Sequence, residues 1–332
     1  MKNNLKINTL YISYDGILEP LGDSQVLSYL EKFPSIYKIH LFTFEKKENK
    51  NNNLLKILNR ISKNDIYWIK KKYLNSPKFL GTIFNILQGM IISFYIIFIK
   101  KIKIVHVRSY IPAIMIYFLK KFMNFKLIFD MRGFWADEKI DRVGWRKKDL
   151  KYKFFKFFEK KILYNSDEII CLTLDSSLIL KKKYPFIYDK NISIIPTCAD
   201  ENYFKPIIQT KKNKILTFGY LGSTEYAYNI DKILMLFSSF LKIDNNLQLL
   251  IFNKNLNNIL VERIKKFNLP NNKIIVNFYD KENLNIAINK IDVGLFFANE
   301  NYSIKASFPT KIAELLLSGK PILCNNINND VK

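Results

Sequence analysis

Residues 305–323 contain side chains well suited to hold an anionic group. The pattern predicts a helix over Pro309–Ser318, with Thr310 in its first turn. The first turn of a helix presents free N–H groups and partial positive charge, to which Lys305 and Lys311 add cationic charge. Such a site can stabilise the charge that develops on a departing phosphate group, so Lys311 is a candidate catalytic residue.

Charged and glycine residues also follow two expected strands in the first half of the chain. Gly22 lies in a turn-rich loop, where its missing side chain permits close backbone approach to an anionic group. Asp15 and Glu19 in that loop are candidate acceptor contacts, with turn capping as an equal alternative. Asp130 and Arg132 follow another strand and are candidate catalytic residues, although Asp130 alone could simply cap its loop. In parallel sheets the ligand site lies at the carboxyl ends of the strands.

Apolar strand-like runs alternate with helical patterns along the chain, which predicts an α/β fold of stacked βαβ units. The strands expected in the first half are residues 7–12, 38–44, 65–69, 102–107, 126–130, 168–173 and 192–195. Those expected in the second half are residues 214–220, 247–252, 273–279, 292–298 and 321–324. The other helices expected in the second half cover residues 231–243, 256–267 and 282–290.

The alternation restarts after a polar, proline-containing stretch, which indicates two domains. We expect an N-terminal Rossmann-like domain over residues 1–200, a linker over 201–213 and a second domain over 214–332. Two facing parallel sheets place a ligand cleft between the domains.

Seven segments, in chain order, resemble bacterial glycosyltransferase family 4. They are YISYDGILEPLGDSQVLSYL (11–30), RSYIPA (108–113), FDMRGFWADE (129–138), SDEIICLT (166–173), IPTCADENYF (195–204), GYLGS (219–223) and SFPTKIAELLLSGKPIL (307–323). The resemblance covers essentially the whole chain and implies the GT-B fold. It also implies metal-independent transfer, with retention of anomeric configuration, of a hexose-type sugar from a nucleoside-diphosphate donor. The acceptor would be a hydroxyl of a glycan or lipid-linked molecule in surface polysaccharide or glycolipid assembly, and no cofactor is implied.

The same resemblance implies the donor site. Glu314 occupies the position of a glutamate that accepts hydrogen bonds from the ribose hydroxyls, and the two oxygens of a carboxylate suit a vicinal diol. Arg132 stands where many members have a histidine near the transferred sugar. The residues assigned to the donor are Gly22, Gly222, Ser223, Lys305, Ser307, Pro309, Thr310, Lys311 and Glu314.

Besides Arg132 in place of histidine, the sequence departs from the family pattern at two further points. Ala306 stands where a second glutamate usually touches the sugar, and Ser223 and Tyr228 replace the usual phosphate-binding arginine and lysine. The family also continues beyond the strand expected at residues 321–324 and returns to the first domain. We therefore expect a second domain that is incomplete at its C-terminal end.

The charge of the chain predicts an anionic partner. Lys and Arg number 53 against 29 Asp and Glu, for a net charge of +24, although a coding bias towards lysine would give the same excess. Base-edge recognition favours arginine, and only residues 60, 108, 132, 142, 146 and 263 are Arg. We therefore expect no nucleic-acid partner. Three alternatives to a glycosyltransferase stay open: a nucleic-acid-binding protein, an inactive transferase fragment and a nucleotide-sugar epimerase.

The cysteine and histidine content favours a reducing, cytoplasmic compartment. Cys171, Cys198 and Cys324 are odd in number and lack a CxxC spacing, and the chain has only two histidines. Neither a disulfide framework nor a metal site is predicted. The first eight residues also lack the apolar core of a signal peptide.

Residues 79–99 contain no charge and are long enough for a membrane span. Thr82, Asn85, Gln88 and Ser93 nevertheless form one polar stripe at helical spacing. The segment also leads directly into an expected buried strand, so we favour a helix packed on the sheet over a membrane span.

A second segment, Arg146–Tyr164, interleaves lysine with phenylalanine and tyrosine at helical spacing. This pattern is typical of a basic amphipathic helix on an anionic membrane surface. An ordinary domain helix with its lysines in water fits equally well, and one helix can serve both roles.

Overall fold

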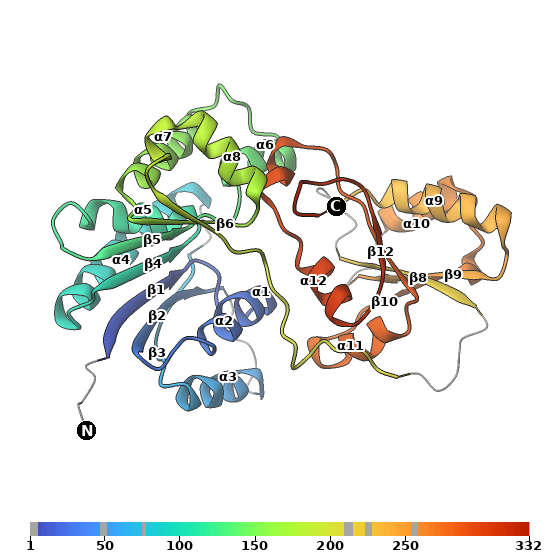
Figure 1. The fold of residues 1–332 in the computed structure, drawn as a ribbon, viewed down its shortest axis with the longest axis horizontal. Coiled ribbons are helices and arrows are strands. Elements are labelled where there is room, and N and C mark those ends of the chain that lie inside the picture. Colours follow the sequence, from blue (N-terminus) through green and yellow to red (C-terminus); the bar gives the residue numbers. More distant parts are fainter. Residues whose placement is uncertain are drawn as a thin grey trace. The chain divides into compact units, whose positions relative to one another are not determined.

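The computed structural model describes residues 6–46, 52–74, 78–208, 215–222, 228–253 and 258–331 (Figure 1). The chain forms two compact units. The first comprises Met1–Ile140 and Gly144–Pro196, and the second comprises Asp141–Val143 and Thr197–Lys332. Each unit is a parallel β-sheet with helices on its faces, which confirms the α/β fold with two Rossmann-like domains.

The first unit contains a seven-stranded sheet in the order β3-β2-β1-β4-β5-β6-β7. All seven strands coincide with expected ones, and β3 is shifted because Asp65, at a φ of 53°, lies in the preceding turn. The strands are β1 (Ile7–Ser13), β2 (Tyr37–Glu45), β3 (Tyr67–Lys72), β4 (Ile104–Arg108), β5 (Lys126–Asp130), β6 (Glu168–Cys171) and β7 (Asn191–Ile194).

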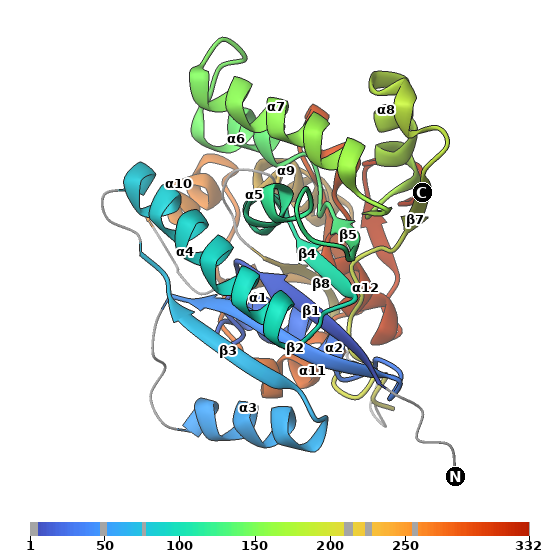
Figure 2. The ribbon, with the colours of Figure 1, turned by 90° about the vertical axis from the view of Figure 1, so that its left-hand side faces the viewer.

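Helices connect these strands. After β1 the chain makes one helical stretch: α1 (Pro20–Gly22), a π-helical turn (Asp23–Leu27) and α2 (Ser28–Leu30). The other helices are α3 (Asn52–Lys63), α4 (Lys78–Ile99), α5 (Tyr110–Leu119), α6 (Trp135–Val143), α7 (Leu150–Asn165) and α8 (Leu174–Lys183), with a 3-10 turn at Pro185–Ile187. Helix α4 packs on α5 and α5 packs on α7, so these three helices form one layer (Figure 2).

The second unit contains a five-stranded sheet in the order β10-β9-β8-β11-β12. Its strands, all at expected positions, are β8 (Leu216–Leu221), β9 (Leu247–Phe252), β10 (Ile274–Asn277), β11 (Val293–Phe296) and β12 (Ile322–Cys324). Its helices are α9 (Ile230–Ile243), α10 (Asn258–Lys266), α11 (Lys281–Asn289) and α12 (Thr310–Leu317), with 3-10 turns at Asn271–Lys273 and Tyr302–Ala306. The expectation of an incomplete second domain stays a prediction.

Residues that lie in the expected linker pack on the second unit. Phe204 is buried in its core, and the N–H groups of Lys205 and Ile207 donate to the side chains of Asn285 and Asn289 at 3.2 and 2.9 Å. Hydrogen bonds to two side chains of α11 therefore tie this segment to the helix.

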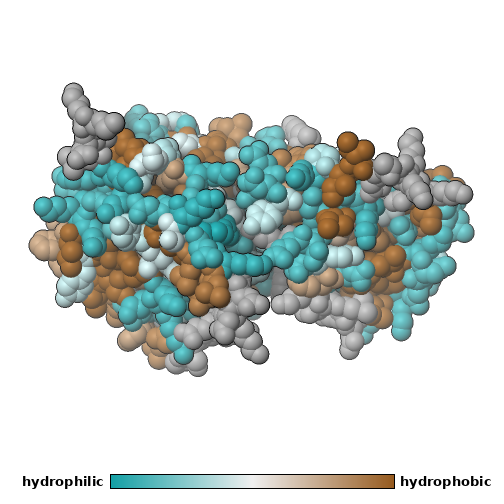
Figure 3. Space-filling view, turned by 90° about the horizontal axis from the view of Figure 1, so that it is seen from below, coloured by the Kyte–Doolittle hydropathy of each residue, from teal (hydrophilic) through white to brown (hydrophobic). Residues whose placement is uncertain are grey.

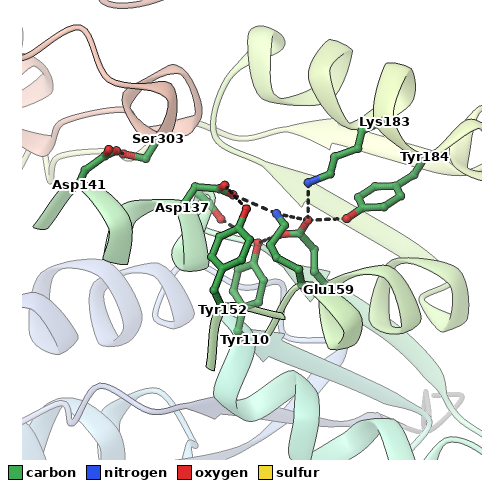
Figure 4. Close-up of polar contacts among 10 residues, drawn as sticks. Tyr110, Asp137, Asp141, Tyr152, Glu159, Lys183, Tyr184 and Ser303 are labelled. Carbon is green, nitrogen blue, oxygen red and sulfur yellow. Dashed lines mark hydrogen bonds and ion pairs between the residues drawn. The ribbon is translucent and has the colours of Figure 1, made fainter. Parts of the chain in front are cut away.

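A buried carboxylate holds the α7 region of the first unit together. Glu159 of α7 is fully buried and accepts hydrogen bonds from the hydroxyls of Tyr110 and Tyr184, each at 2.8 Å (Figure 4). Lys156 Nζ lies 2.5 Å from it and 2.9 Å from Asp137. The donors come from α5, α7 and the end of α8, so one buried side chain links three helices.

His40 makes the stability of the first unit depend on pH. It is buried in β2, and burial, with help from Lys100 and Lys38, lowers its pKa from 6.5 to about 4. Because the folded pKa is the lower one, this contribution to stability is complete above pH 6.5 and is lost as pH falls towards 4. We expect acidification over this range to cost about 3 kcal/mol at this site, at about 1.4 kcal/mol per pKa unit.

Urea denaturation at several pH values checks this prediction. The His40→Gln variant, which has no titrating group at this position, should show a flatter dependence of unfolding free energy on pH than the unmodified chain. Identical slopes in the two proteins would show that His40 is not the group responsible.

Candidate functional site

The first group of site residues lies at the carboxyl ends of three adjacent strands. In the sheet register Ser13 of β1 pairs with Arg108 of β4, which pairs in turn with Asp130 of β5. The loops after these strands carry Asp15 and Arg132. The structure therefore brings the predicted residues Asp15, Asp130 and Arg132 to one edge of the sheet.

These side chains form a compact charged cluster. Asp130 Oδ1 lies 3.9 Å from Arg132 Nη1, and Asp130 Oδ2 lies 3.9 Å from His106 Nε2. Arg108 Nη1 lies 4.0 Å from Asp15 Oδ2. Burial alone would raise the pKa of Asp130, but neighbouring His106, Arg132 and Arg108 outweigh it and lower the pKa. Asp130 is therefore an ionised carboxylate, held in charge balance by its cationic neighbours.

The backbone at this edge adopts sparsely populated conformations. Ser109, directly after β4, has a φ of 72°, and Arg132, two residues after the end of β5, has a φ of 56°. Gly133 follows at 115°. The Ser109 N–H donates to the Asp130 carbonyl at 2.8 Å, which fastens one loop to the other. Such strain persists only where the surroundings fix it, and it is concentrated at functional sites.

Backbone N–H groups of the loop after β1 are hydrogen-bonded to a carboxylate of the chain itself. The N–H groups of Ile17 and Leu18 donate to Glu45 Oε1 and Oε2 at 3.0 and 3.1 Å. Gly22 packs on this loop, because a Cβ there would lie 1.9 Å from the Gly16 carbonyl oxygen. Close backbone contact thus explains Gly22, whose predicted donor contact stays a prediction. Glu19 pairs with Lys46 at 3.0 Å.

Sequence reasoning missed Arg108, His106 and Glu45 as members of this edge. Arg108 and His106 belong to a strand that reads IVHVR and are almost completely buried, which is costly for charged groups without partners. A histidine and an arginine in an otherwise apolar strand were the available signal.

The second group of site residues lies on the second unit. Strands β8 and β11 are neighbours, and beyond their carboxyl ends Tyr228 forms an isolated bridge with Ala298. Gly222, after β8, has a φ of 136°, a conformation that L-residues rarely adopt. Ser223 lies outside the described residues. The loop after β11 leads through Lys305 and Ser307 into α12.

The start of α12 has the features predicted for an anion site. Pro309 is its N-cap residue, and no side chain caps the helix. Thr310 begins the helix, and Lys305 is exposed just before it. The Ser307 hydroxyl is directed to the Ser303 carbonyl at 3.4 Å, a long hydrogen bond. N–H groups at an uncapped helix start can bind an anion.

Glu314 and Lys311, both predicted donor contacts, lie one turn apart in α12 and pair with each other. Lys311 Nζ lies 3.0 Å from Glu314 Oε2 and 3.3 Å from Oε1, and the Glu314 side chain is only 12% exposed. The lysine thus neutralises the carboxylate in this state of the protein.

Asparagine side chains that sequence reasoning missed hold the loop after β11. Asn325 accepts from the Ala298 N–H and donates to its carbonyl, both at 3.0 Å. Asn229 donates to Asn299 at 2.9 Å, and Asn328 donates to the Ser307 carbonyl at 3.0 Å. The chain is rich in asparagine, so its composition gave no signal for these positions.

No group of three or more His, Cys, Asp or Glu side chains within the described ranges is arranged to hold a metal ion. A pocket of about 370 Å³ lies between the loop after β10 and α11, lined by residues that include Tyr279, Asn283 and Lys290. Its lining contains none of the predicted donor residues.

Solved structures similar to this chain share its fold. A glycosyltransferase from Rickettsia africae is 18% identical, with a TM-score of 0.67 over 97% of this chain and 80% of that one. A sucrose-phosphate synthase from Thermosynechococcus elongatus is 12% identical, with a TM-score of 0.65 over 96% and 81%. A UDP-N-acetylglucosamine 2-epimerase is 11% identical, with a TM-score of 0.56 over 96% and 78%.

Neither a family model nor a curated protein sequence matches the chain. At identities this low, the likeness to solved structures shows the fold alone. The chain therefore has the GT-B fold of two Rossmann-like domains.

Proposed function

We propose that the chain is a cytoplasmic glycosyltransferase similar to family 4, which moves a hexose-type sugar from a nucleoside-diphosphate donor to a hydroxyl group. The observation that carries this proposal is the start of α12, where an uncapped helix, Lys305, Lys311 and Glu314 lie together after β11. Diphosphate and ribose present the two chemistries that these groups match, a multiple anion and a vicinal diol. The names of the two similar transferases support the same class of reaction.

The donor would change the partners within α12. In the proposed complex the Glu314 carboxylate accepts hydrogen bonds from the ribose hydroxyls. Lys311, released from Glu314, turns its ammonium to the diphosphate. The lysine and the helix N–H groups then stabilise the negative charge that grows as the bond between the sugar and the phosphate breaks.

The residues at the carboxyl ends of the strands in the first unit would contact the transferred sugar and the acceptor. We assign Arg132 and Asp130 to the transferred sugar, and Asp15 and Glu19 to the acceptor. Asp130 is buried and charge-balanced by its neighbours, so it is poorly suited to form a covalent sugar intermediate. We therefore propose that the acceptor oxygen attacks the sugar from the face that the diphosphate leaves, which retains the anomeric configuration. The hydroxyl proton passes to the departing phosphate oxygen, without a metal ion.

The acceptor in this proposal is a glycan or a lipid-linked molecule of surface polysaccharide or glycolipid assembly. A lipid-linked acceptor would bring the enzyme to an anionic membrane. Helix α7 supports peripheral attachment, because Phe154 and Phe157 are 45% and 56% exposed beside the exposed lysines 151, 153, 160 and 161.

A panel of nucleoside-diphosphate sugars, screened by thermal shift with a metal chelator present, tests the donor proposal. The correct donor should raise the melting temperature by mass action. Incubation with an acceptor should then yield a product whose anomeric configuration, read by NMR, matches the donor. No shift with any donor would contradict the proposal, and turnover that requires added metal would contradict its metal independence.

Similarity to a UDP-N-acetylglucosamine 2-epimerase supports a second candidate, epimerisation of the donor sugar. The two activities differ in whether the reaction needs an acceptor. An epimerase converts the nucleotide sugar without an acceptor, whereas a transferase releases the nucleoside diphosphate only when an acceptor takes the sugar. Binding of DNA or RNA that falls steeply with salt, without sugar turnover, would instead support the nucleic-acid alternative.

Removing the ammonium of Lys311 should slow the chemical step. We expect Lys311→Ala to lower kcat about 100-fold, within the range found when a group that stabilises transition-state charge is removed. Single-turnover kinetics measures the step. Lys320→Ala is the control. This lysine lies three residues after the end of α12 and donates to the Asn289 carbonyl. Equal rates in the Lys311 variant and the unmodified enzyme would remove Lys311 from the proposed site.

A further inference from the structure

Helix α4 has an inverted distribution of side chains for a helix of a water-soluble domain. Its small and polar residues face inwards: Asn85 and Ser93 are fully buried, and Gly89 is buried between them. Its large apolar residues face outwards, with Phe84, Ile91 and Phe98 at 53%, 55% and 70% exposure. Only 28% of the apolar stretch Leu80–Ile99 is buried. A domain helix in water normally shows the opposite arrangement.

Specific contacts fix this orientation. Asn85 Nδ2 donates to the Tyr14 hydroxyl at 2.8 Å and to the Leu74 carbonyl at 3.0 Å. A Cβ on Gly89 would lie 2.4 Å from Met115 Sδ, so this glycine lets α4 approach α5 closely. The polar stripe therefore belongs to the interior of the unit, and the apolar face stays outside.

The apolar surface extends onto the neighbouring helices of the same layer. Phe118 near the end of α5 and Phe122 just after it are 41% and 86% exposed, and Phe154 and Phe157 of α7 follow. Hydrophobic side chains are visible at the surface on the left of the space-filling view, where the first unit lies (Figure 3). Exposed apolar side chains gathered on adjacent helices indicate a partner.

We infer that α4 lies in the plane of an anionic membrane, with its apolar face in the lipid and its polar stripe on the protein. The inference does not depend on the transferase reaction. The helix is about 30 Å long, at about 1.5 Å per residue, which also matches a membrane span. A span is disfavoured because α4 forms the crossover between β3 and β4 of one parallel sheet.

Charge decides between a membrane and a second copy of the chain. Residues 79–99 carry no charge, and exposed Lys100, Lys101 and Lys103 follow directly. Lysine beside an apolar face reaches lipid headgroups, whereas interfaces between proteins are depleted in lysine. Two copies that each carry +24 would also repel each other, while an anionic membrane attracts both.

Flotation of the full chain with phosphatidylcholine vesicles, with and without phosphatidylglycerol, tests the inference. We expect binding to the anionic vesicles that persists in part at high salt. The triple variant Phe84→Ser, Ile91→Ser, Phe98→Ser should bind at least tenfold more weakly with an unchanged or higher melting temperature. The control Met235→Ser, Ile243→Ser, Ile286→Ser removes equally exposed apolar side chains from the second unit and should bind normally.

Two further measurements separate the remaining outcomes. A tryptophan placed by Phe94→Trp should be quenched more by lipids brominated near the headgroup than by lipids brominated at the chain ends, after subtraction of the three native tryptophans. Equal binding of the triple variant and its control would overturn the role of α4. If the double variant Phe154→Ser, Phe157→Ser then abolishes binding, α7 is the membrane contact. Quenching from the chain ends would indicate a span, and sedimentation as a dimer that only the α4 variant abolishes would indicate a second copy.

Discussion

Replacing Glu314 by Gln should raise the dissociation constant of the nucleoside-diphosphate sugar at least tenfold. The substitution keeps the size of the side chain but exchanges an ionised acceptor for an amide, so hydrogen bonds of about 1.5–3 kcal/mol to the ribose are weakened or lost. A tenfold change corresponds to about 1.4 kcal/mol. The partly exposed Lys311 pair contributes less than about 1 kcal/mol to stability, so the fold should change little.

Isothermal titration with the donor, or with the nucleoside diphosphate alone, measures the change. Glu262→Gln is the matched control, because this glutamate is exposed on α10 and lies outside the α12 region. Unchanged affinity in the Glu314 variant, with normal melting behaviour, would mean that α12 is not the donor helix. Loss of affinity in both variants would point to a general effect of charge.

Replacing Glu159 by Gln should lower the free energy of unfolding by about 3–5 kcal/mol, because removing one partner of a buried ion pair leaves the other without compensation. Lys156 is 13% exposed and would keep only Asp137 as its anionic partner. Burial alone would lower the pKa of Lys156, but Glu159 and Asp137 outweigh it and raise the pKa. The hydroxyls of Tyr110 and Tyr184 would also exchange a carboxyl acceptor for an amide.

Urea denaturation measures this loss, and Glu168→Gln, whose carboxylate accepts from exposed Asn191, is the control and should change stability by less than about 1 kcal/mol. The double variant Lys156→Met, Glu159→Leu removes this ion pair but also takes the cationic partner from buried Asp137, so it should not restore the stability of the unmodified chain. A Glu159→Gln variant as stable as its control would contradict the assignment of Glu159 as the centre of this cluster.

Local properties of the sequence were sufficient to place the elements of the fold. Each strand of both sheets overlaps an apolar run, although β3 continues into three lysines, and α12 begins where a proline followed by threonine predicts a helix start. The polar stripe of α4 was also visible as a helical period. These patterns are readable because backbone geometry repeats over two residues in a strand and about 3.6 in a helix.

The sequence alone did not show which side of α4 faces solvent. The expectation for a domain helix is that its polar stripe meets water, and the structure places Asn85 and Ser93 inside instead. The hydrogen bond from Asn85 to Tyr14 joins residues 71 positions apart, so no local period can report it.

The tertiary structure also decided the composition of the first-unit site. Arg108 meets Asp130 because β4 and β5 pair in one particular register, and Glu45 reaches the amides of Ile17 and Leu18 because β1 and β2 are neighbours. Strand order and register follow from packing of the whole sheet, whereas sequence periodicity fixes only the elements themselves. The sequence therefore determined which residues end the strands, and the folded sheet determined which of them meet.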